Sequence, residues 1–240
     1  MALSINYVYQ IVRDILQKDA RGFITPVEFN RLATYAQEEV FNDIYALYTR
    51  ALQKRTNRLE YKDLIYNSIT QIEDDLMPCK RNGVSLAQVS VNNFSYPSDY
   101  KYFISCSYNG ITCEELREST DYVLNSRTAP TTAYPAVERN YNVITAYPTS
   151  ITSGLTLTYY KIPQGVNASG TPVSSSPTWA YDTVGGQSVY NATNSVQFEL
   201  PESTYNKIIV RILQLSGMSI REAEVVAFAS AEEVEDINQE

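Results

Sequence analysis

Apolar residues recur every three or four positions through the first third of the chain, which is the spacing of one helix face. The second of these stripes follows Thr25-Pro26-Val27-Glu28, where Thr25 can cap a helix, Pro26 suits the first helical position and Glu28 completes a capping box. A third stripe runs over 59–76 and ends at Met77-Pro78. The pattern predicts a helical N-terminal part, residues 1–82. The apolar positions of its first two helices are Val8, Ile11, Val12, Ile15, Leu16, Phe29, Leu32, Ala33, Ala36, Val40, Ile44 and Leu47.

The last forty residues show the same period and predict a helical hairpin over residues 200–240. Gly217 is expected to end its first helix as a left-handed cap, and Ser219 with Glu222 forms a capping box for the second. The apolar face needs a partner, and the N-terminal helices are nearest in kind, so the two parts are predicted to pack together. The end of the chain is expected to fray, with docking to a basic partner as the alternative; its acidic residues include Glu232, Glu233, Glu235 and Asp236.

Between residues 83 and 199 the period changes to the alternation of strands. Asn109-Gly110 suits a type I′ turn between two strands. Further strands are expected near 141–147 and 155–161, and long exposed loops over 164–178 and 183–195, with Trp179 covering an edge of the β-rich part. The order of helices, strands and helices predicts an α+β fold, in which a helical bundle from the N- and C-terminal segments carries an inserted antiparallel β-sandwich or small barrel over 83–199.

Composition and charge exclude some classes of function but do not identify one. The chain has no His, 20 Tyr and a net charge of −8. Without His, the common nucleophile–base pairs are excluded within this chain. Tyr suits strands as well as protein interfaces, and both interpretations stay open. A basic run, Arg50 to Arg58, fits a solvated helix face better than a site that binds the phosphates of DNA. An acidic protein surface would repel these phosphates and so let DNA slide past.

The candidate chemical groups are weak. Glu73-Asp74-Asp75 and Glu114-Glu115 are adjacent carboxylates, which point in different directions on a helix or a strand. Gly185-Gly186 lacks the strand–glycine–helix context of a phosphate loop and a following Lys-Ser or Lys-Thr. The sequence therefore predicts no catalytic, cofactor-binding or metal-binding residue. A carboxylate-based glycan hydrolase is kept as a minor alternative, although no pair of acids is favoured.

Cysteine usage is typical of a reducing compartment, with three residues and no C-x-x-C spacing. Cys106 and Cys113 lie symmetrically about Asn109-Gly110 and should face each other across the hairpin. Two buried thiols are favoured there, and a disulfide is the alternative. We expect no signal peptide and no membrane span, because residues 1–20 carry charges within a helical pattern and no apolar run is long enough.

Several stretches resemble structural proteins of tailed bacteriophages. Taken together they are similar to the head-to-tail connector proteins, that is, the adaptor, ring or neck proteins, of short-tailed phages, including the crAss-like group. The stretches that carry the resemblance are Gly22 to Ala33, Ala36 to Glu39, Tyr147-Pro148, Tyr159 to Pro163, Pro177 to Trp179, Phe198 to Pro201, Ile208 to Gly217 and Ile220 to Glu224.

The resemblance implies a structural virion protein and no enzyme. Such proteins form a homo-oligomeric ring, usually of twelve copies, that docks to the portal protein, extends the DNA channel and attaches other tail or ring proteins. DNA would pass without specific binding, with no membrane involved. The protein would be assembled in the host cytoplasm and serve genome ejection from the virion neck or tail. A non-virion assembly factor or binding module is the alternative from another class.

Overall fold

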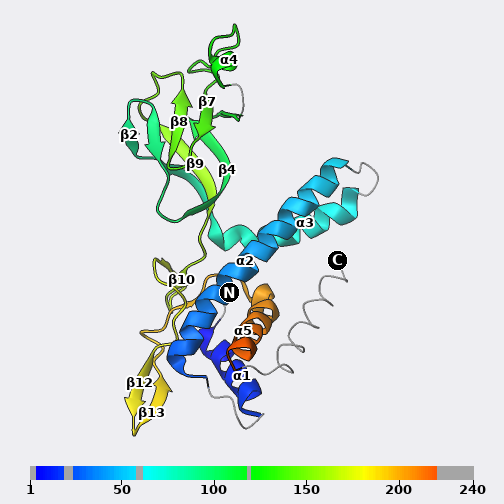
Figure 1. The fold of residues 1–240 in the computed structure, drawn as a ribbon, viewed down its shortest axis with the longest axis vertical. Coiled ribbons are helices and arrows are strands. Elements are labelled where there is room, and N and C mark those ends of the chain that lie inside the picture. Colours follow the sequence, from blue (N-terminus) through cyan, green and yellow to red (C-terminus); the bar gives the residue numbers. More distant parts are fainter. Residues whose placement is uncertain (1–3, 19–23, 58–61, 118–119, 221–240) are drawn as a thin grey trace. The chain divides into compact units, whose positions relative to one another are not determined.

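The structure is a computed structural model that describes residues 4–18, 24–57, 62–117 and 120–220 (Figure 1). It is a mixed α+β protein with five α-helices and several antiparallel sheets in these residues, which contain no closed barrel. The chain divides into two compact units. The first comprises residues 1–78 and 163–240, here the helical unit, and the second comprises residues 79–162, here the β unit.

The helical unit contains α1 (Ile5–Lys18), α2 (Pro26–Asn57), α3 (Lys62–Leu76) and α5 (Tyr205–Ile220). The predicted capping box at the start of α2 is confirmed. The backbone N–H of Thr25 donates to Glu28 Oε2 over 3.0 Å, and the N–H of Glu28 donates to Thr25 Oγ1 over 3.3 Å. These two bonds satisfy donors that a helix start leaves without partners. In the same structure α2 continues through the basic run as far as Asn57.

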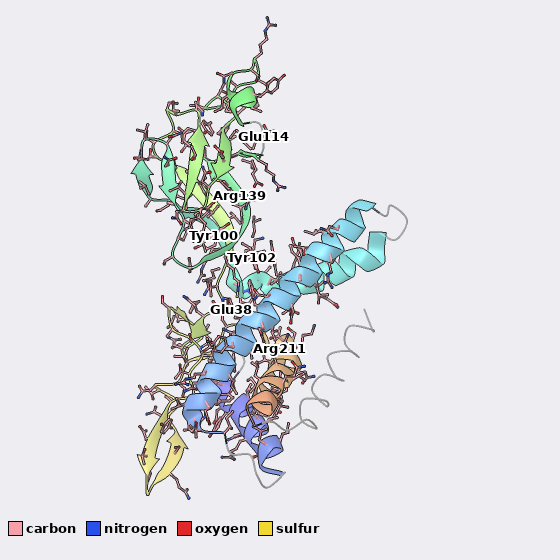
Figure 2. The ribbon with its side chains drawn as sticks, viewed as in Figure 1. Glu38, Tyr100, Tyr102, Glu114, Arg139 and Arg211 are labelled. Carbon is pink, nitrogen blue, oxygen red and sulfur yellow. The ribbon has the colours of Figure 1, made fainter. Side chains whose placement is uncertain are left out.

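The apolar stripes of α1, α2 and α5 form the core of the helical unit. A stacked pair, Tyr7 and Tyr205, joins α1 to α5 with ring centroids 5.2 Å apart. Arg211 on α5, labelled in Figure 2, binds Glu39 over 3.2 Å and Asp43 over 2.9 Å. These two acids share one face of α2 because they are four residues apart. The fully buried side chains of this core are Ile5, Val8, Val12, Phe29, Ala33, Ala36, Phe41, Ile208 and Ile212.

The expected end of the first C-terminal helix at Gly217 is wrong. Helix α5 continues past Gly217 to Ile220, so Gly217 is a buried helical residue and does not end the helix. Glycine favours a C-cap but does not impose one, because a helix tolerates it at a cost of about 1 kcal/mol. Glu222 and the acidic end of the chain lie outside the described residues.

The β unit begins with the short helix η1 (Met77–Cys79) at its boundary and contains two sheets. One has the order β1-β9-β4-β5 and the other β2-β3-β8-β7-β6, in which β6 and β7 run parallel. Helix α4 (Thr120–Leu124) lies in the connection between β6 and β7. The strands are β1 (Lys80–Ser85), β2 (Gln88–Ser90), β3 (Asn93–Ser95), β4 (Tyr100–Tyr108), β5 (Ile111–Thr112), β6 (Glu114–Leu116), β7 (Ala136–Arg139), β8 (Val143–Tyr147) and β9 (Leu155–Lys161).

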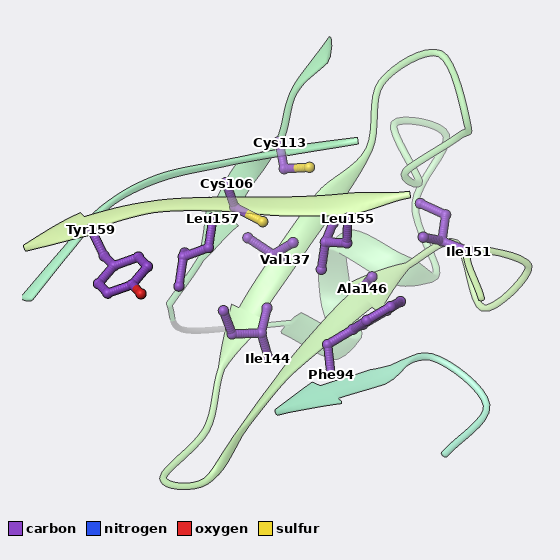
Figure 3. Close-up of a cluster of buried hydrophobic side chains, with 10 residues drawn as sticks. All are labelled: Phe94, Cys106, Cys113, Val137, Ile144, Ala146, Ile151, Leu155, Leu157 and Tyr159. Carbon is purple, nitrogen blue, oxygen red and sulfur yellow. The ribbon is translucent and has the colours of Figure 1, made fainter. Parts of the chain in front are cut away.

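One apolar cluster receives side chains from both sheets of the β unit (Figure 3). Strands β3, β7 and β8 contribute from one sheet, and β4 and β9 contribute from the other. The cluster consists of Phe94, Cys106, Cys113, Val137, Ile144, Ala146, Ile151, Leu155, Leu157 and Tyr159. Because ten buried residues form this core within residues 79–162, the β unit has its own source of hydrophobic stabilisation.

The predicted hairpin around Asn109-Gly110 is confirmed. Both residues have positive φ, 48° and 84°, as a type I′ turn requires. The N–H of Cys113 donates to the carbonyl of Cys106 over 2.9 Å, so the two cysteines are cross-strand neighbours. Both are buried free thiols, so the structure contains the favoured pair of thiols and not the alternative disulfide.

Residues 163–199 group with the helical unit, whereas the predicted β insertion extended to residue 199. They form the sheet β11-β10-β14 and the hairpin β12–β13. The expectation of an exposed loop over 183–195 is wrong in its first half, which is this hairpin. Strand composition could not show which unit these strands pack against, because tertiary contacts with α1 and α2 decide it. The strands are β10 (Gly165–Val166), β11 (Pro172–Val173), β12 (Tyr181–Val184), β13 (Gln187–Tyr190) and β14 (Gln197–Phe198), and the helix η2 (Glu202–Thr204) follows them.

We predict that residues 79–162 fold as an isolated fragment. The fragment holds a complete apolar core, and its first and last strands pair with Lys80 opposite Tyr160, so its two ends leave the sheet side by side. The measurement is urea unfolding of the fragment followed by circular dichroism. A single cooperative transition is expected, and a gradual loss of signal would show that the β unit depends on the rest of the chain.

We also predict that the thiols of the folded protein resist alkylation. Cys79, Cys106 and Cys113 are buried, and the pKa of Cys106 is raised because its proton is held in a hydrogen bond to Cys113 and because the thiol is buried. A raised pKa leaves little of the reactive thiolate at Cys106, whereas the same hydrogen bond lowers the pKa of Cys113, so the protection of Cys113 and Cys79 rests on burial. At pH 8, iodoacetamide should modify the native chain roughly a hundredfold more slowly than the chain in guanidinium chloride, as followed by mass spectrometry. Equal rates would contradict this burial.

Candidate functional site

A long stretch of the chain is almost without charge. Residues 162–198, here the neutral segment, contain one ionisable acid or base of the Asp, Glu, Lys and Arg types, namely Asp182. The whole chain carries 19 Lys and Arg and 27 Asp and Glu, so charge is depleted in this segment. The segment is rich in Ser, Thr, Asn and Gly and contains the single Trp. Depletion of charge with retained aromatic residues is the compositional signature of an interface centre.

Trp179 fastens the neutral segment to the helices. Its ring stacks on Tyr9 of α1 with centroids 4.2 Å apart, and its indole N–H donates to Asn6 Oδ1 over 3.0 Å. The side-chain amide of Asn30 on α2 binds both backbone polar groups of Trp179. Asn30 Oδ1 accepts from the Trp179 N–H over 2.8 Å, and Asn30 Nδ2 donates to the Trp179 carbonyl over 3.2 Å. Trp179 was expected to cover an edge of the β-rich part over 83–199; its ring packs on helix α1 and, within that part, on Tyr181 and Tyr190.

A second polar clamp, Gln37 on α2, holds both ends of the neutral segment. Its Nε2 donates to the carbonyl of Gln164 over 2.7 Å, and its Oε1 accepts from the N–H of Glu199 over 2.9 Å. The N–H of Gln164 in turn donates to Glu199 Oε2 over 2.8 Å. Gln37 is 1% exposed, and the buried amide therefore has partners for both its polar atoms.

The hairpin β12–β13 extends from the Trp179 anchor. Tyr181 and Tyr190, which lie opposite each other at its base, stack on Trp179 at 5.7 and 5.9 Å. The turn is Gly185-Gly186, with φ of 61° and 82°, values that favour glycine at both positions. Gly185-Gly186 is thus a hairpin turn, in keeping with the absence of phosphate-loop context in the sequence.

The two faces of this hairpin differ. Alternation along the strands places Tyr181 and Tyr190 on the face that meets Trp179. The opposite face presents Val184 and Val189, which are 62% and 49% exposed. Asp182, also on this face, accepts a hydrogen bond from Asn191 Nδ2 over 2.9 Å. The arrangement provides a surface with exposed β-branched residues and a single charge, Asp182, which suits protein binding.

The carboxylates considered in the sequence do not converge on one site. Glu73 accepts a hydrogen bond from Tyr48 over 3.1 Å, whereas Asp75 accepts one from Ser203, so these two acids have different partners. Glu114 is exposed, and Glu115 pairs with Arg139 and Arg117. Across the described ranges, no group of three or more Cys, Asp or Glu side chains could hold a metal ion.

Arg50 is the part of the basic run whose side chain the structure describes, and it is exposed on α2. Arg58 and the acidic residues at 232–236 lie outside the described residues. Among the helices within the described ranges, none combines the length and apolar character that a bilayer span requires.

The β unit carries a cluster that the sequence did not reveal. Arg139 on β7, labelled in Figure 2, pairs with Glu115 over 2.5 Å and lies 4.7 Å from the ring centroid of Phe103 on β4. Tyr100 packs nearby against Tyr96 in a tilted arrangement, with ring centroids 4.4 Å apart. Burial, followed by the neighbouring Tyr100, raises the pKa of Tyr96 to about 12, so its phenol stays protonated near neutral pH and is no general base there. The cluster ties the two sheets together.

Comparison of the chain with protein-family models and with curated proteins gives no match.

We predict that Trp179 is a major source of stability for the helical unit. Trp179→Ala removes a buried ring and its stacking on Tyr9, and should lower the free energy of unfolding by about 3–5 kcal/mol. The matched control Trp179→Phe keeps a ring but loses the bond to Asn6, and should cost roughly 1–3 kcal/mol. Urea unfolding followed by far-UV circular dichroism measures both values, and a cost below about 1 kcal/mol for Trp179→Ala would contradict the anchoring role.

Proposed function

We propose that this protein is a ring-forming head-to-tail adaptor subunit of a short-tailed bacteriophage. In this role several copies assemble under the portal protein, extend the DNA channel and attach the tail. The observation that carries the proposal is the set of large tyrosines that the fold leaves in solvent on both units. The most exposed are Tyr35, Tyr122, Tyr134 and Tyr141, at 64%, 78%, 81% and 96%. Tyrosine provides wide apolar contact with a polar tip, and its exposure suits a subunit that is covered on assembly.

The two-unit organisation supports the same role. In this proposal the helices near both chain termini act as a bundle that packs against neighbouring copies around a ring, and the two sheets of the β unit act as a sandwich that contacts an adjoining ring. Each unit has its own core of buried apolar residues, so either can serve as a docking body without unfolding the other.

The charge of the chain also fits a DNA conduit. A net charge of −8 repels phosphate, so a channel built from these subunits would let a duplex slide instead of binding it. This account needs no cofactor, metal ion or membrane. The protein would be made and assembled in the host cytoplasm and then remain in the virion neck.

The test is the composition and structure of purified phage particles. The chain should be present by mass spectrometry in a fixed ratio to the portal protein, and cryo-electron microscopy should place a symmetric ring of it between portal and tail. Its absence from purified particles would contradict the proposal and favour the alternative, an assembly factor that acts only in the infected cell.

A further inference from the structure

The edges of the sheets differ in how they are protected against pairing with another strand. Unprotected edges present rows of unpaired N–H and C=O groups, and proteins usually blunt them with charges, prolines, bulges or very short strands. In the part of the chain that the structure describes, each edge strand of the three larger sheets has such a feature. β1 carries Lys80, Arg81 and a bulge, β2 has a bulge, β6 carries Glu114 and Glu115, β11 begins with Pro172, and β5 and β14 have two residues each.

The hairpin β12–β13 lacks the bulges, prolines and basic residues that protect such edges, and it carries one charge, Asp182. Its four-residue strands pair in regular register, from Tyr181 opposite Tyr190 to Val184 opposite Gln187, without a bulge. It contains no Pro, Lys or Arg, and its single acid, Asp182, is held by Asn191. In the described residues neither strand pairs with a third strand, so the hairpin has two open edges.

The register identifies which backbone groups face outwards. In a hairpin closed by two residues, the pair beside the turn exchanges hydrogen bonds and the next pair does not. Val184 and Gln187 are the pair beside the turn, so the N–H and C=O groups of Thr183 on β12 and Ser188 on β13 point away from the hairpin. Each edge therefore offers a donor and an acceptor at its centre.

The charge distribution indicates what pairs with these edges. Two copies of a chain with a net charge of −8 repel each other over most of their surfaces. The neutral segment, which holds the hairpin, is where such copies can meet with least repulsion, since Asp182 is its one charge. A basic partner protein would instead favour the acidic surfaces elsewhere on the chain.

We propose that the hairpin β12–β13 joins copies of this chain by strand addition, with β12 of one copy pairing antiparallel to β13 of the next. Because the two edges belong to different strands, each copy uses both, and the contact is head-to-tail. Such contacts generate a closed ring when the rotation between copies closes. Val184 and Val189 of adjacent copies then lie on one face of a continuous sheet and bury surface that is exposed in one chain. This contact would join the copies of the ring in the proposed function, and it therefore rests on that function.

The experiment measures self-association of the full chain by native mass spectrometry over a range of concentrations. Thr183→Pro removes the outward N–H of the β12 edge, and Ser188→Pro removes that of the β13 edge. Neither substitution removes a donor used within the hairpin, because both N–H groups point outwards. The matched controls Thr183→Ala and Ser188→Ala keep the N–H. The wild type and both Ala variants should associate beyond dimers, and each Pro variant alone should associate roughly tenfold or more weakly.

A mixture of the two Pro variants makes the test specific. Thr183→Pro retains an intact β13 edge and Ser188→Pro an intact β12 edge, so the mixture should form one-to-one heterodimers and stop there. Loss of association with Ser188→Pro only, or with Thr183→Pro only, would overturn the head-to-tail pairing. Association of both Pro variants at the wild-type level would overturn the hairpin interface as a whole.

Folding of the variants is read from Trp179, the single Trp of the chain, whose fluorescence reports its stacking with Tyr181 and Tyr190. If a Pro variant changes this signal, Val184→Asp with Val189→Asp replaces it. These substitutions leave the backbone intact and bring like charges together across the proposed junction. A wild-type chain that stays monomeric in solution would overturn the inference, whereas the adaptor role is decided separately by the content of purified particles.

Discussion

The burial of Trp179 against the first two helices is the interaction on which the helical unit depends. Asn30 binds both polar groups of its backbone and Tyr9 stacks on its ring, so the middle of the neutral segment is held against α1 and α2. Gln37 holds the two ends of the same segment. Two amide side chains of α2 thus attach the segment to the helices, and the hairpin beyond Trp179 is regular although most of its residues are exposed.

The helical unit and the β unit differ in what their apolar cores hold in place. The β unit closes on its own apolar core and receives the chain at β1 and returns it at β9, which are neighbours in one sheet. The helical unit uses its core to hold the neutral segment in place. Each unit therefore has its own apolar core, which is compatible with the proposed assembly role.

Local signals were sufficient to predict several elements, and tertiary contacts determined the rest. The capping box at Thr25 and Glu28 and the turn at Asn109-Gly110 involve neighbouring residues and could be read directly. The extension of α5 through Gly217 could not, because burial against other helices overrides a weak preference.

The candidate site was partly visible in the sequence. The scarcity of charge over 162–198 and the single Trp can be read there, and so could have marked the segment as an interface. Its attachment to α2 could not be predicted, because the bonds of Trp179 with Asn30 join residues 149 positions apart. The regular strands around Gly185-Gly186 were missed because the flanking residues, Ser, Thr, Gln and Asp, are as common in loops as in exposed hairpins.

We propose the hairpin β12–β13, whose one charge is Asp182, as the contact between copies. Amide hydrogen exchange of the assembled ring and of the single subunit, resolved over peptides that cover 181–190, tests it most directly. The account predicts that exchange at the outward-facing amides of Thr183 and Ser188 slows on assembly, since each gains a strand partner, while the inner strands of the β unit are unchanged. Equal exchange at 181–190 in both states would contradict it.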